Sequence, residues 1–336
     1  MACTSRRNFL RNAALLPAAV LPPPPAGQIM TVRGPLPPEK LGLTLPHEHL
    51  MSMFGEPAAE RASYDREKLF AAVVPYLVSL RQLGCRAIAD CTTAYFGRDP
   101  ALLRELSEKS GLHVLTNTGY YGAANDRYIP SHAHKETAGQ LAQRWVREWR
   151  EGIDGTGIRP GFMKLGVDAG PLSEIDRKLV VAAARAHLAS GLVIAVHTGN
   201  NPVAAEQQLA ILKAEGVSPA AWIWVHAHSV KDEAALLQAA KEGAWLEFDG
   251  LDPDSVNRHL ELARLMKENG FLERVLISHD GNSFRAGGQP PKPYDALFKV
   301  FIPALKSAGF TEQEIRQLTV ENPRRAFTVQ ARKAGS

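Results

Sequence analysis

From about residue 40, the chain alternates between two hydrophobic patterns. Short apolar runs that end in polar residues are each followed by an amphipathic stretch with a helical period. The runs are LGLTLPHEHL, CRAIADCTTA, LHVLTNTGYY, GFMKLGVD, LVIAVHTGN, WIWVHAH, AWLEFDG and RVLISHDG. Eight strand-helix repeats predict parallel strands with right-handed crossovers, closed into an α/β fold of the (β/α)8 TIM-barrel type. An open doubly wound sheet is the alternative, but it normally has fewer strands.

The stretches between the runs carry helix start and stop signals. In 65–83, apolar residues recur at helical spacing and Gly84 ends the pattern. Ser173 precedes another such stretch, with Glu174 and Asp176 in its first turn, where the helix dipole favours acids. The other helices are expected at 100–109, 136–150, 203–214, 231–241, 254–268, 294–308 and 311–318, with a short terminal helix from Asn322.

Residues suited to chemistry follow the ends of the predicted strands. In LTLPHEHL, strand alternation places Leu43, Leu45, His47 and His49 on one face, although His-x-His also occurs on solvated strands and in loops. Because the carboxyl ends of barrel strands meet at one face, side chains at other strand ends should converge there too. These are Lys164, His197, His226 or His228, and Asp280.

This set predicts a metal centre with two ions. Four imidazoles, a lysine and an aspartate exceed the three protein ligands that a catalytic zinc normally takes, and they suit two divalent ions close together. An ammonium on Lys164 would repel a dication, whereas the carbamate that a lysine forms with carbon dioxide can bridge both ions. The apolar neighbours Phe162, Met163 and Leu165 favour the neutral, reactive amine.

Other histidines fit the pattern less well. His187 and His259 lie on predicted helices and are expected to face solvent. His113 begins its strand, at the end away from the candidate site, and is expected to be structural. His279 precedes Asp280 on the same predicted strand and therefore points to the opposite face, so we expect it to pack or to form a hydrogen bond.

Five segments resemble the phosphotriesterase family of the amidohydrolase superfamily. They are GPLPPEKLGLTLPHEHL, FMKLGVDAG, VIAVHTG, GVSPAAWIWVH and LISHD, and the resemblance runs from about Thr31 to Phe327. It implies a distorted (β/α)8 barrel with a binuclear, zinc-type centre. On the family's pattern, His47, His49 and Asp280 hold the more buried ion, His197 and His226 hold the more exposed one, and carbamylated Lys164 bridges both together with a hydroxide.

The resemblance leaves one ligand open. Counting without gaps from Gly216 selects His226 on the sixth strand, and His228, which has the same strand parity, is the alternative. The family's proton relay, a histidine after strand seven and an aspartate after strand six, is replaced here by Gly250 and Ser229.

The resemblance implies a hydrolase in which Asp280 accepts the proton of the nucleophilic hydroxide. We expect a small-molecule substrate with an ester bond, either a lactone or a carboxylic ester, and phosphotriester cleavage as a side reaction. Hydrolysis of an amide is one alternative. A barrel that binds a metal or a small molecule without turnover is another.

Candidate substrate contacts come from the loops after the strands. Tyr120 and Tyr121 follow the third strand, and Arg285 and Lys292 follow the eighth. Asp249 ends the seventh strand and either orients a ligand or has a structural role.

The first 26 residues have a different composition. Ser5-Arg6-Arg7-Asn8-Phe9-Leu10, an apolar stretch and prolines resemble a twin-arginine export signal, and a disordered basic tail is the alternative. Without 1–26, the net charge falls from +4 to +1, because three arginines leave. We therefore expect a periplasmic or secreted protein with 27–40 as a lead-in and 41–330 as a single barrel.

The remaining bulk properties exclude several classes of partner. The chain is 45% hydrophobic and 22% charged, which is typical of a soluble globular protein. With the signal removed, no basic patch favours nucleic acid, and no apolar run in the body is long enough for a membrane span. Cys85 and Cys91 are expected as packed thiols. Many members of the resembled family form dimers, so a homodimer is an expectation.

Overall fold

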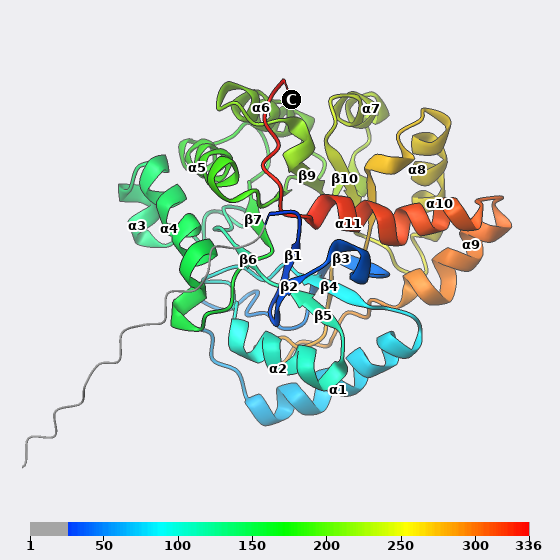
Figure 1. Cartoon of the computed structure of the whole chain (residues 1–336), viewed down its shortest axis with the longest axis horizontal. Coiled ribbons are helices and arrows are strands. Elements are labelled where there is room, and N and C mark those ends of the chain that lie inside the picture. Colours follow the sequence, from blue (N-terminus) through cyan, green and yellow to red (C-terminus); the bar gives the residue numbers. More distant parts are fainter. Residues whose placement is uncertain (1–25, 336) are drawn as a thin grey trace, which may run out of the picture.

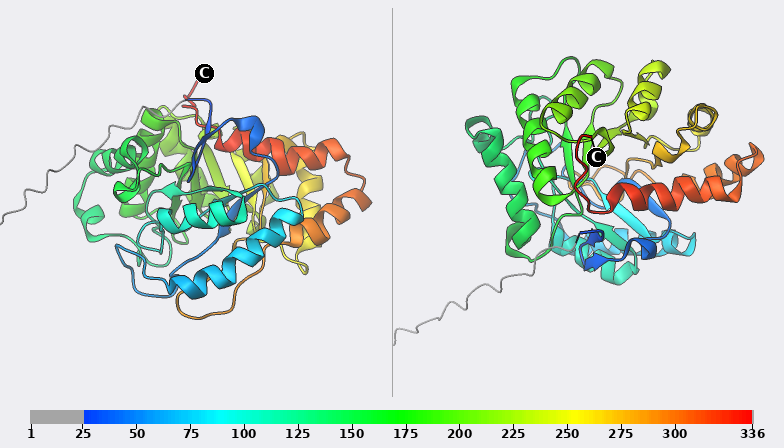
Figure 2. Two further views of the ribbon diagram at one scale, coloured as in Figure 1. Left: turned by 60° about the horizontal axis from the view of Figure 1, so that its bottom comes forward. Right: turned by 45° about the horizontal axis from the view of Figure 1, so that its top comes forward.

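A computed structural model describes residues 26–335 and has a closed barrel of parallel strands surrounded by helices (Figures 1 and 2). Apart from Ala26, the segment interpreted as an export signal lies outside the described residues. Within 26–335, no helix is both long and apolar enough to cross a membrane.

Two parallel sheets join to close the barrel. One has the strand order β11-β10-β9-β8-β7-β6 and the other has the order β12-β3-β4-β5. Thr116 alone separates β5 from β6, and 278–280 separate β11 from β12, so the two sheets continue into each other and form eight strand positions. The strands are β3 (Thr44–His49), β4 (Ala87–Asp90), β5 (His113–Leu115), β6 (Asn117–Thr118), β7 (Phe162–Gly166), β8 (Ile194–His197), β9 (Trp222–Val225), β10 (Trp245–Phe248), β11 (Val275–Ile277) and β12 (Gly281–Asn282).

The helices surround the strands as the hydrophobic pattern predicts (Figure 1). Side-chain caps begin two of them: Ser173, expected before its helix, forms a capping box with Asp176, and Asp65 accepts the Lys68 N–H. The α-helices are α1 (Arg66–Gln82), α2 (Pro100–Ser110), α3 (Ser131–Lys135), α4 (Ala138–Glu151), α5 (Glu174–Ser190), α6 (Pro202–Ala214), α7 (Glu233–Lys241), α8 (Val256–Glu268), α9 (Ile302–Ser307), α10 (Glu312–Arg316) and α11 (Asn322–Phe327). Short 3-10 turns cover Pro38–Lys40, Ile153–Gly155, Pro219–Ala221, Ala227–Ser229 and Leu272–Arg274.

The helix expected at 294–308 begins later and is not regular. Leu297–Phe301 forms a π-helical turn immediately before α9, and a second π-helical turn, Gln317–Glu321, comes before α11. Pro303 and Pro323 are near the start of these two helices. A proline supplies no N–H and its ring clashes with the carbonyl four residues back, so a wider turn accommodates it.

Strand alternation determines which side chains face the barrel interior. On β7, Phe162 packs with the interior cluster, whereas Met163 and Leu165 pack outward against the helices. Trp245 of β10 likewise faces inward. The same period of two directs Lys164 inward, which is the orientation that the metal-site prediction requires.

The expectation that Leu43 and Leu45 share a face with His47 and His49 is wrong. Leu45 packs in the outer cluster with the helices, and Leu43 packs against that cluster. The pairing of β3 with β4 shifts register between Leu45 and Glu48, as in a β-bulge. Such a bulge adds a residue to one strand, so the face reverses before the histidines.

Other segments cover the end of the barrel at which the parallel strands begin. The antiparallel hairpin of β1 (Ile29–Thr31) and β2 (Gly34–Leu36) lies there together with α11, which crosses the centre of Figure 1. Phe327 of α11 packs edge-to-face on Phe162 at 5.4 Å between ring centroids. The C-terminal segment runs beside the hairpin, where Val329 exchanges backbone hydrogen bonds with Gly27 and Gln28. These segments close the barrel interior at this end, and the cavity described below opens at the opposite end.

Candidate metal centre

One cavity of about 170 Å³ opens at the carboxyl ends of the strands. All six side chains predicted as metal ligands line it, although they come from strands far apart in the sequence. Its lining residues are His47, His49, Phe54, Phe96, Tyr121, Lys164, His197, His226, Asp280, Asn282 and Arg285. The structure thus brings the whole predicted ligand set together.

His47, His49 and Asp280 form the first candidate ion site. The Nε2 atoms of His47 and His49 lie 3.4 and 3.3 Å from Oδ1 of Asp280. On His49, Nδ1 donates to Thr92 Oγ1 at 2.7 Å, because that hydroxyl already donates to the Met51 carbonyl.

This arrangement fits a cation. Because the proton of His49 is on Nδ1, its Nε2 has a lone pair directed at a carboxylate oxygen, which is repulsive unless a cation lies between them. Two ligands held tetrahedrally about 2.05 Å from a zinc ion lie about 3.3 Å apart. The observed separations of 3.3 and 3.4 Å match that value.

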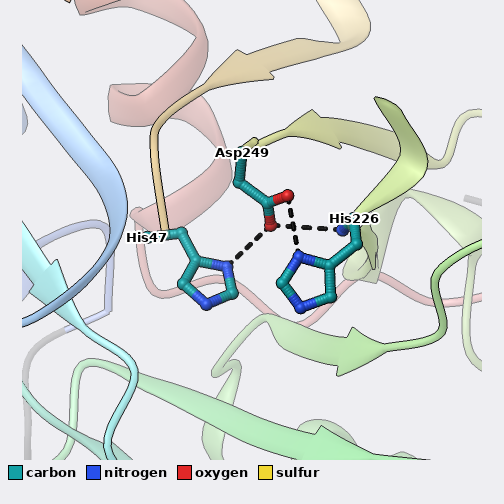
Figure 3. Close-up of side chains that lie close together, drawn as sticks. All are labelled: His47, His226 and Asp249. Atoms are coloured by element: carbon teal, nitrogen blue, oxygen red, sulfur yellow. Dashed lines mark hydrogen bonds and ion pairs between the residues drawn. The ribbon is translucent and has the colours of Figure 1, made fainter. Parts of the chain in front are cut away.

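Asp249 holds two of the imidazoles from behind (Figure 3). Its side chain lies 2.8 Å from Nδ1 of both His47 and His226 and also accepts the His226 backbone N–H at 3.1 Å. The three side chains form a second possible ion-binding group. However, the carboxylate contacts the Nδ1 edges, which fixes the ring orientation and leaves each Nε2 available to a metal. Asp249 therefore orients two candidate ligands from behind them.

Burial and charge set the protonation of the two carboxyl groups behind the histidines, those of Asp249 and Glu247. Burial opposes ionisation of Asp249, but His226 and His47 outweigh it and hold its pKa well below the usual range. Burial and the adjacent Asp249 raise the pKa of Glu247, whose Oε2 is 2.9 Å from His47 Nδ1, well above its usual range. A neutral Glu247 beside an ionised Asp249 leaves one negative charge behind the histidines.

Two of the cavity residues have a left-handed backbone, His226 at φ 63° and Asp280 at φ 51°. This conformation costs free energy in residues other than glycine, so neighbouring groups must hold it. Asp249 binds the His226 N–H. Buried Glu48 accepts the N–H groups on both sides of Asp280, from His279 at 3.2 Å and Gly281 at 2.7 Å. A buried carboxylate thus supports each strained position.

Lys164 is 2% exposed and has no strong partner. Its Nζ lies 3.5 Å from the Leu165 carbonyl and 5.5 Å from the centre of the Tyr121 ring. No described carboxylate is within ion-pair distance of it. A lysine buried this deeply normally has an ion-pair partner, so its position without one fits the predicted role as a metal ligand.

The imidazoles are suited to metal binding. Burial lowers the pKa of His47 to about 4, against the opposing effect of Asp249. Burial, then His226 and Lys164, lower the pKa of His197 well below its usual range. Both rings are therefore neutral near pH 7, and neutral imidazole is the form that binds a metal.

Residues 27–327 match the sequence profile of the Phosphotriesterase family. The chain belongs to the phosphotriesterase family. It is 29% identical to the phosphotriesterase homology protein of Escherichia coli K12, over 85% of this chain and 98% of that protein. Human N-acetyltaurine hydrolase is 26% identical, over 90% of this chain and 98% of that protein. The structure of organophosphorus hydrolase from Deinococcus radiodurans superposes with a TM-score of 0.78 at 28% identity. The superposition covers 92% of this chain and 99% of that one.

The family consists of binuclear metal hydrolases, and its barrel is the fold found here. This phosphotriesterase-family chain is accordingly a hydrolytic enzyme with histidine and aspartate groups that can bind metal. The organophosphorus and N-acetyltaurine hydrolases act on different bonds, so membership alone does not name the substrate.

The phosphotriesterase-family site includes some predicted substrate contacts and not others. Tyr121 and Arg285 line the cavity. Tyr120 instead donates to or accepts from His132 Nε2 at 3.0 Å, outside the cavity lining. Lys292 donates to the His279 carbonyl. His228, the alternative ligand, is absent from the lining, and its Nδ1 lies 3.0 Å from Oδ1 of Asp249.

Two histidines expected to face solvent are buried. His187 is 0% exposed and His259 is 1% exposed. Each uses Nδ1 to donate to a carbonyl, that of Leu192 and that of Ser255 respectively. A histidine on the inner face of an amphipathic helix is accommodated once its ring nitrogen has such a partner.

Several residues that shape the site were missed from sequence. Phe54, Phe96 and Asn282 line the cavity. Glu247 supports it from within the barrel, and Glu48 supports it from the outer face of β3, where it accepts the Gly281 N–H. The strand pattern offered a signal for Glu247, which shares parity with Asp249, but no comparable signal marked the loop residue Phe54.

Proposed function

We propose that this enzyme hydrolyses a small carboxylic ester or amide at a centre of two divalent ions. His47, His49 and Asp280 would hold one ion, His197 and His226 the other, and Lys164, as its carbamate, would bridge them. The observation that carries the proposal is the convergence of these six side chains on one cavity. Zinc suits a set of imidazole and carboxylate ligands.

The metal ions would supply a water of lowered pKa, near 7, and a Lewis acid for the substrate's carbonyl oxygen. Asp280 would accept the proton released as water attacks. Burial opposes ionisation of Asp280, but the neighbouring histidines, His49 first, outweigh burial and hold its pKa below the usual range. Asp280 is therefore ionised when the reaction begins, as a proton acceptor must be.

The cavity walls favour a small substrate with an apolar part and an anionic end. Phe54, 46% exposed, stands at the wall with Phe96 and Tyr121. Arg285 donates to Gln289 Oε1 at 2.8 Å, and no described carboxylate pairs with it. A guanidinium free of acids can bind a substrate carboxylate or sulfonate. N-acetyltaurine hydrolase, a relative, is named for an amide substrate with such an end.

Metal analysis combined with a substrate panel tests the proposal. Wild-type protein should hold two metals per chain and cleave at least one ester, lactone or amide. Lys164→Ala should lose metal and at least about a hundredfold in kcat, whereas Lys241→Ala, at an exposed helix end, should change neither. Two metals with no turnover of any ester, lactone, amide or phosphotriester would favour a binding protein instead.

Arg285 is tested separately with paired substrates. N-acetyl-β-alanine carries a carboxylate, and N-acetylpropylamine is a neutral counterpart of similar length. Arg285→Gln should raise KM for the acid about tenfold and leave the neutral amide unchanged, with Arg285→Lys intermediate. An equal loss on both substrates would assign Arg285 a structural role.

We also propose export through the twin-arginine route. The support is the segment Ser5-Arg6-Arg7-Asn8-Phe9-Leu10. A tagged full-length chain should fractionate with the periplasm, and Arg6→Lys with Arg7→Lys should retain it in the cytoplasm. Cytoplasmic wild-type protein would refute this route.

A further inference from the structure

A second concave surface lies at the strand starts, on the face opposite the metal centre. It has a volume of about 670 Å³, and residues far apart in the sequence line it. Four arginines and the ring of Trp245 dominate the lining, and we call these five residues the arginine pocket. They are Arg274, Arg324, Arg325, Arg332 and Trp245.

The arginine pocket is assembled around Trp245, which is 2% exposed. The guanidinium carbons of Arg274 and Arg325 lie 5.5 and 5.8 Å from the centre of its ring. Arg332 reaches in from the C-terminal segment, and its Nη2 donates to the carbonyls of Arg325, Ala326 and Thr328. Three of the four guanidinium groups are therefore held in place, which lowers the entropic cost of binding a ligand.

Positive charge in this pocket exceeds the nearby negative charge. Glu273 lies 3.7 Å from Arg274 and 3.9 Å from Arg325, which are loose ion pairs. Glu321 pairs with Arg324 but also with Arg316, outside the pocket. Neither glutamate belongs to the pocket lining.

Arg332 has no described carboxylate partner and uses three carbonyls instead. Burial, together with Arg274 and Arg325, lowers the pKa of Arg332 to about 10. Mutual repulsion of this kind destabilises the protein unless an anion offsets it.

We propose that the arginine pocket binds a tetrahedral oxyanion with two negative charges, that is, the phosphate group of free phosphate or of a phosphate monoester. Guanidinium groups match the oxygens of a phosphate in pairs, and each such bond is charge-assisted. The excess of positive charge favours an anion over a neutral molecule. The site is independent of the metal centre, and a ligand there would join α11 and the C-terminal segment to the strand starts.

Titrations of the metal-loaded enzyme at constant ionic strength test this site. Inorganic phosphate and glycerol 3-phosphate are the probes, and sodium chloride is the control salt. Each probe that binds should raise Tm in a saturable manner and change tryptophan fluorescence. Trp245→Phe should abolish the fluorescence change but keep the rise in Tm. If only the response to glycerol 3-phosphate saturates below millimolar concentration, the ligand is a phosphate ester. If both probes bind equally, the ligand is free phosphate.

The Arg324→Gln, Arg325→Gln double variant should weaken binding at least about tenfold, because two charge-assisted partners are lost. Arg264→Gln, an exposed arginine on α8, is the matched control and should bind as wild type does. Hydrolysis should be unchanged in both.

Phosphate bound at the metal centre would behave differently. That binding would survive in the double variant and disappear in Lys164→Ala, and this result would overturn the proposal. Equal effects of phosphate and chloride on Tm would also overturn it. Neither result would bear on the hydrolase function.

Discussion

Gly250 and His228 occupy one small volume beside Asp249. A Cβ atom built on Gly250 would lie 2.2 Å from Nε2 of His228. The backbone of Gly250 is not left-handed, so neighbouring atoms, and not conformation, select glycine here. His228 also stacks on His259, with 5.6 Å between ring centroids. A side chain at 250 thus requires the His228 ring to move or to be replaced.

A double-mutant cycle at this contact tests the steric argument. Gly250→Ala alone should lower the free energy of unfolding by about 1–3 kcal/mol because of overpacking. In a His228→Ala background, the same change should cost almost nothing. Urea unfolding of the four proteins measures the coupling. Additive effects would show that the clash is relieved without His228.

Asp249 accepts hydrogen bonds from two imidazoles at once, which an asparagine cannot do. In Asp249→Asn, the amide NH2 group would face one N–H donor, so His47 or His226 would lose its orientation. Metal affinity should fall about 10–100-fold, as measured by competition with a chelator. Asp254→Asn, exposed in the following loop, is the control. Unchanged affinity in Asp249→Asn would exclude the orienting role.

At the scale of elements, His187 connects α5 to the C-terminal segment. Nδ1 donates to the Leu192 carbonyl, and Nε2 accepts the Arg332 N–H at 2.8 Å. Burial lowers the pKa of His187 to about 4 in the folded chain, below its usual 6.5. The neutral ring is therefore favoured by folding, and protonation favours the unfolded state.

The contribution of His187 to stability is fully present above pH 6.5 and is lost as the pH falls toward 4. Between pH 7 and pH 5, about 2 kcal/mol should disappear from this residue alone. His187→Gln keeps one donor and one acceptor but does not titrate, so its stability should fall less over this range. Urea unfolding of both proteins at the two pH values measures the difference. Parallel pH profiles would contradict the assignment.

The order and type of the elements were predictable from sequence because each strand and helix has its own periodicity. The irregular elements were not. The bulge that reverses the face of β3 between Leu45 and Glu48 depends on pairing with β4. The regular helix around Pro303 begins later than expected because a π-helical turn precedes it, and the apolar pattern does not predict that turn.

At the scale of the whole molecule, the convergence of the six candidate ligands on one cavity was predictable, because barrel topology brings strand ends together. The residues that support the ligands were harder to find. Glu48 acts on β11 and β12, some 230 residues away, through bonds such as that from Ser278 Oγ. Phe54 and Tyr120 lie in loops, where strand alternation no longer indicates direction. Long-range and loop contacts therefore required the fold.

The C-terminal segment forms hydrogen bonds with parts of the chain that are far from it in sequence. Backbone hydrogen bonds join Gln330 to Gly191, before β8, and join Arg332 to Ser218 and Ala334 to Gly216, before β9. A chain ending at Thr328 should lose at least about 3 kcal/mol of unfolding free energy, since each lost bond counts about 1 kcal/mol. A chain ending at Ala334 is the control and should unfold as the full chain does. Equal stability of the two would show that the segment is dispensable.

The described ends of the chain, around Gly27 and Ala334, both lie at the closed face of the barrel, away from the cavity mouth. Attachment through either end to a bead, an electrode or a fusion partner would leave diffusion into the mouth unobstructed. An immobilised form of this protein should therefore keep its solution turnover when anchored by a terminus, and lose it when anchored through the loop that carries Arg285.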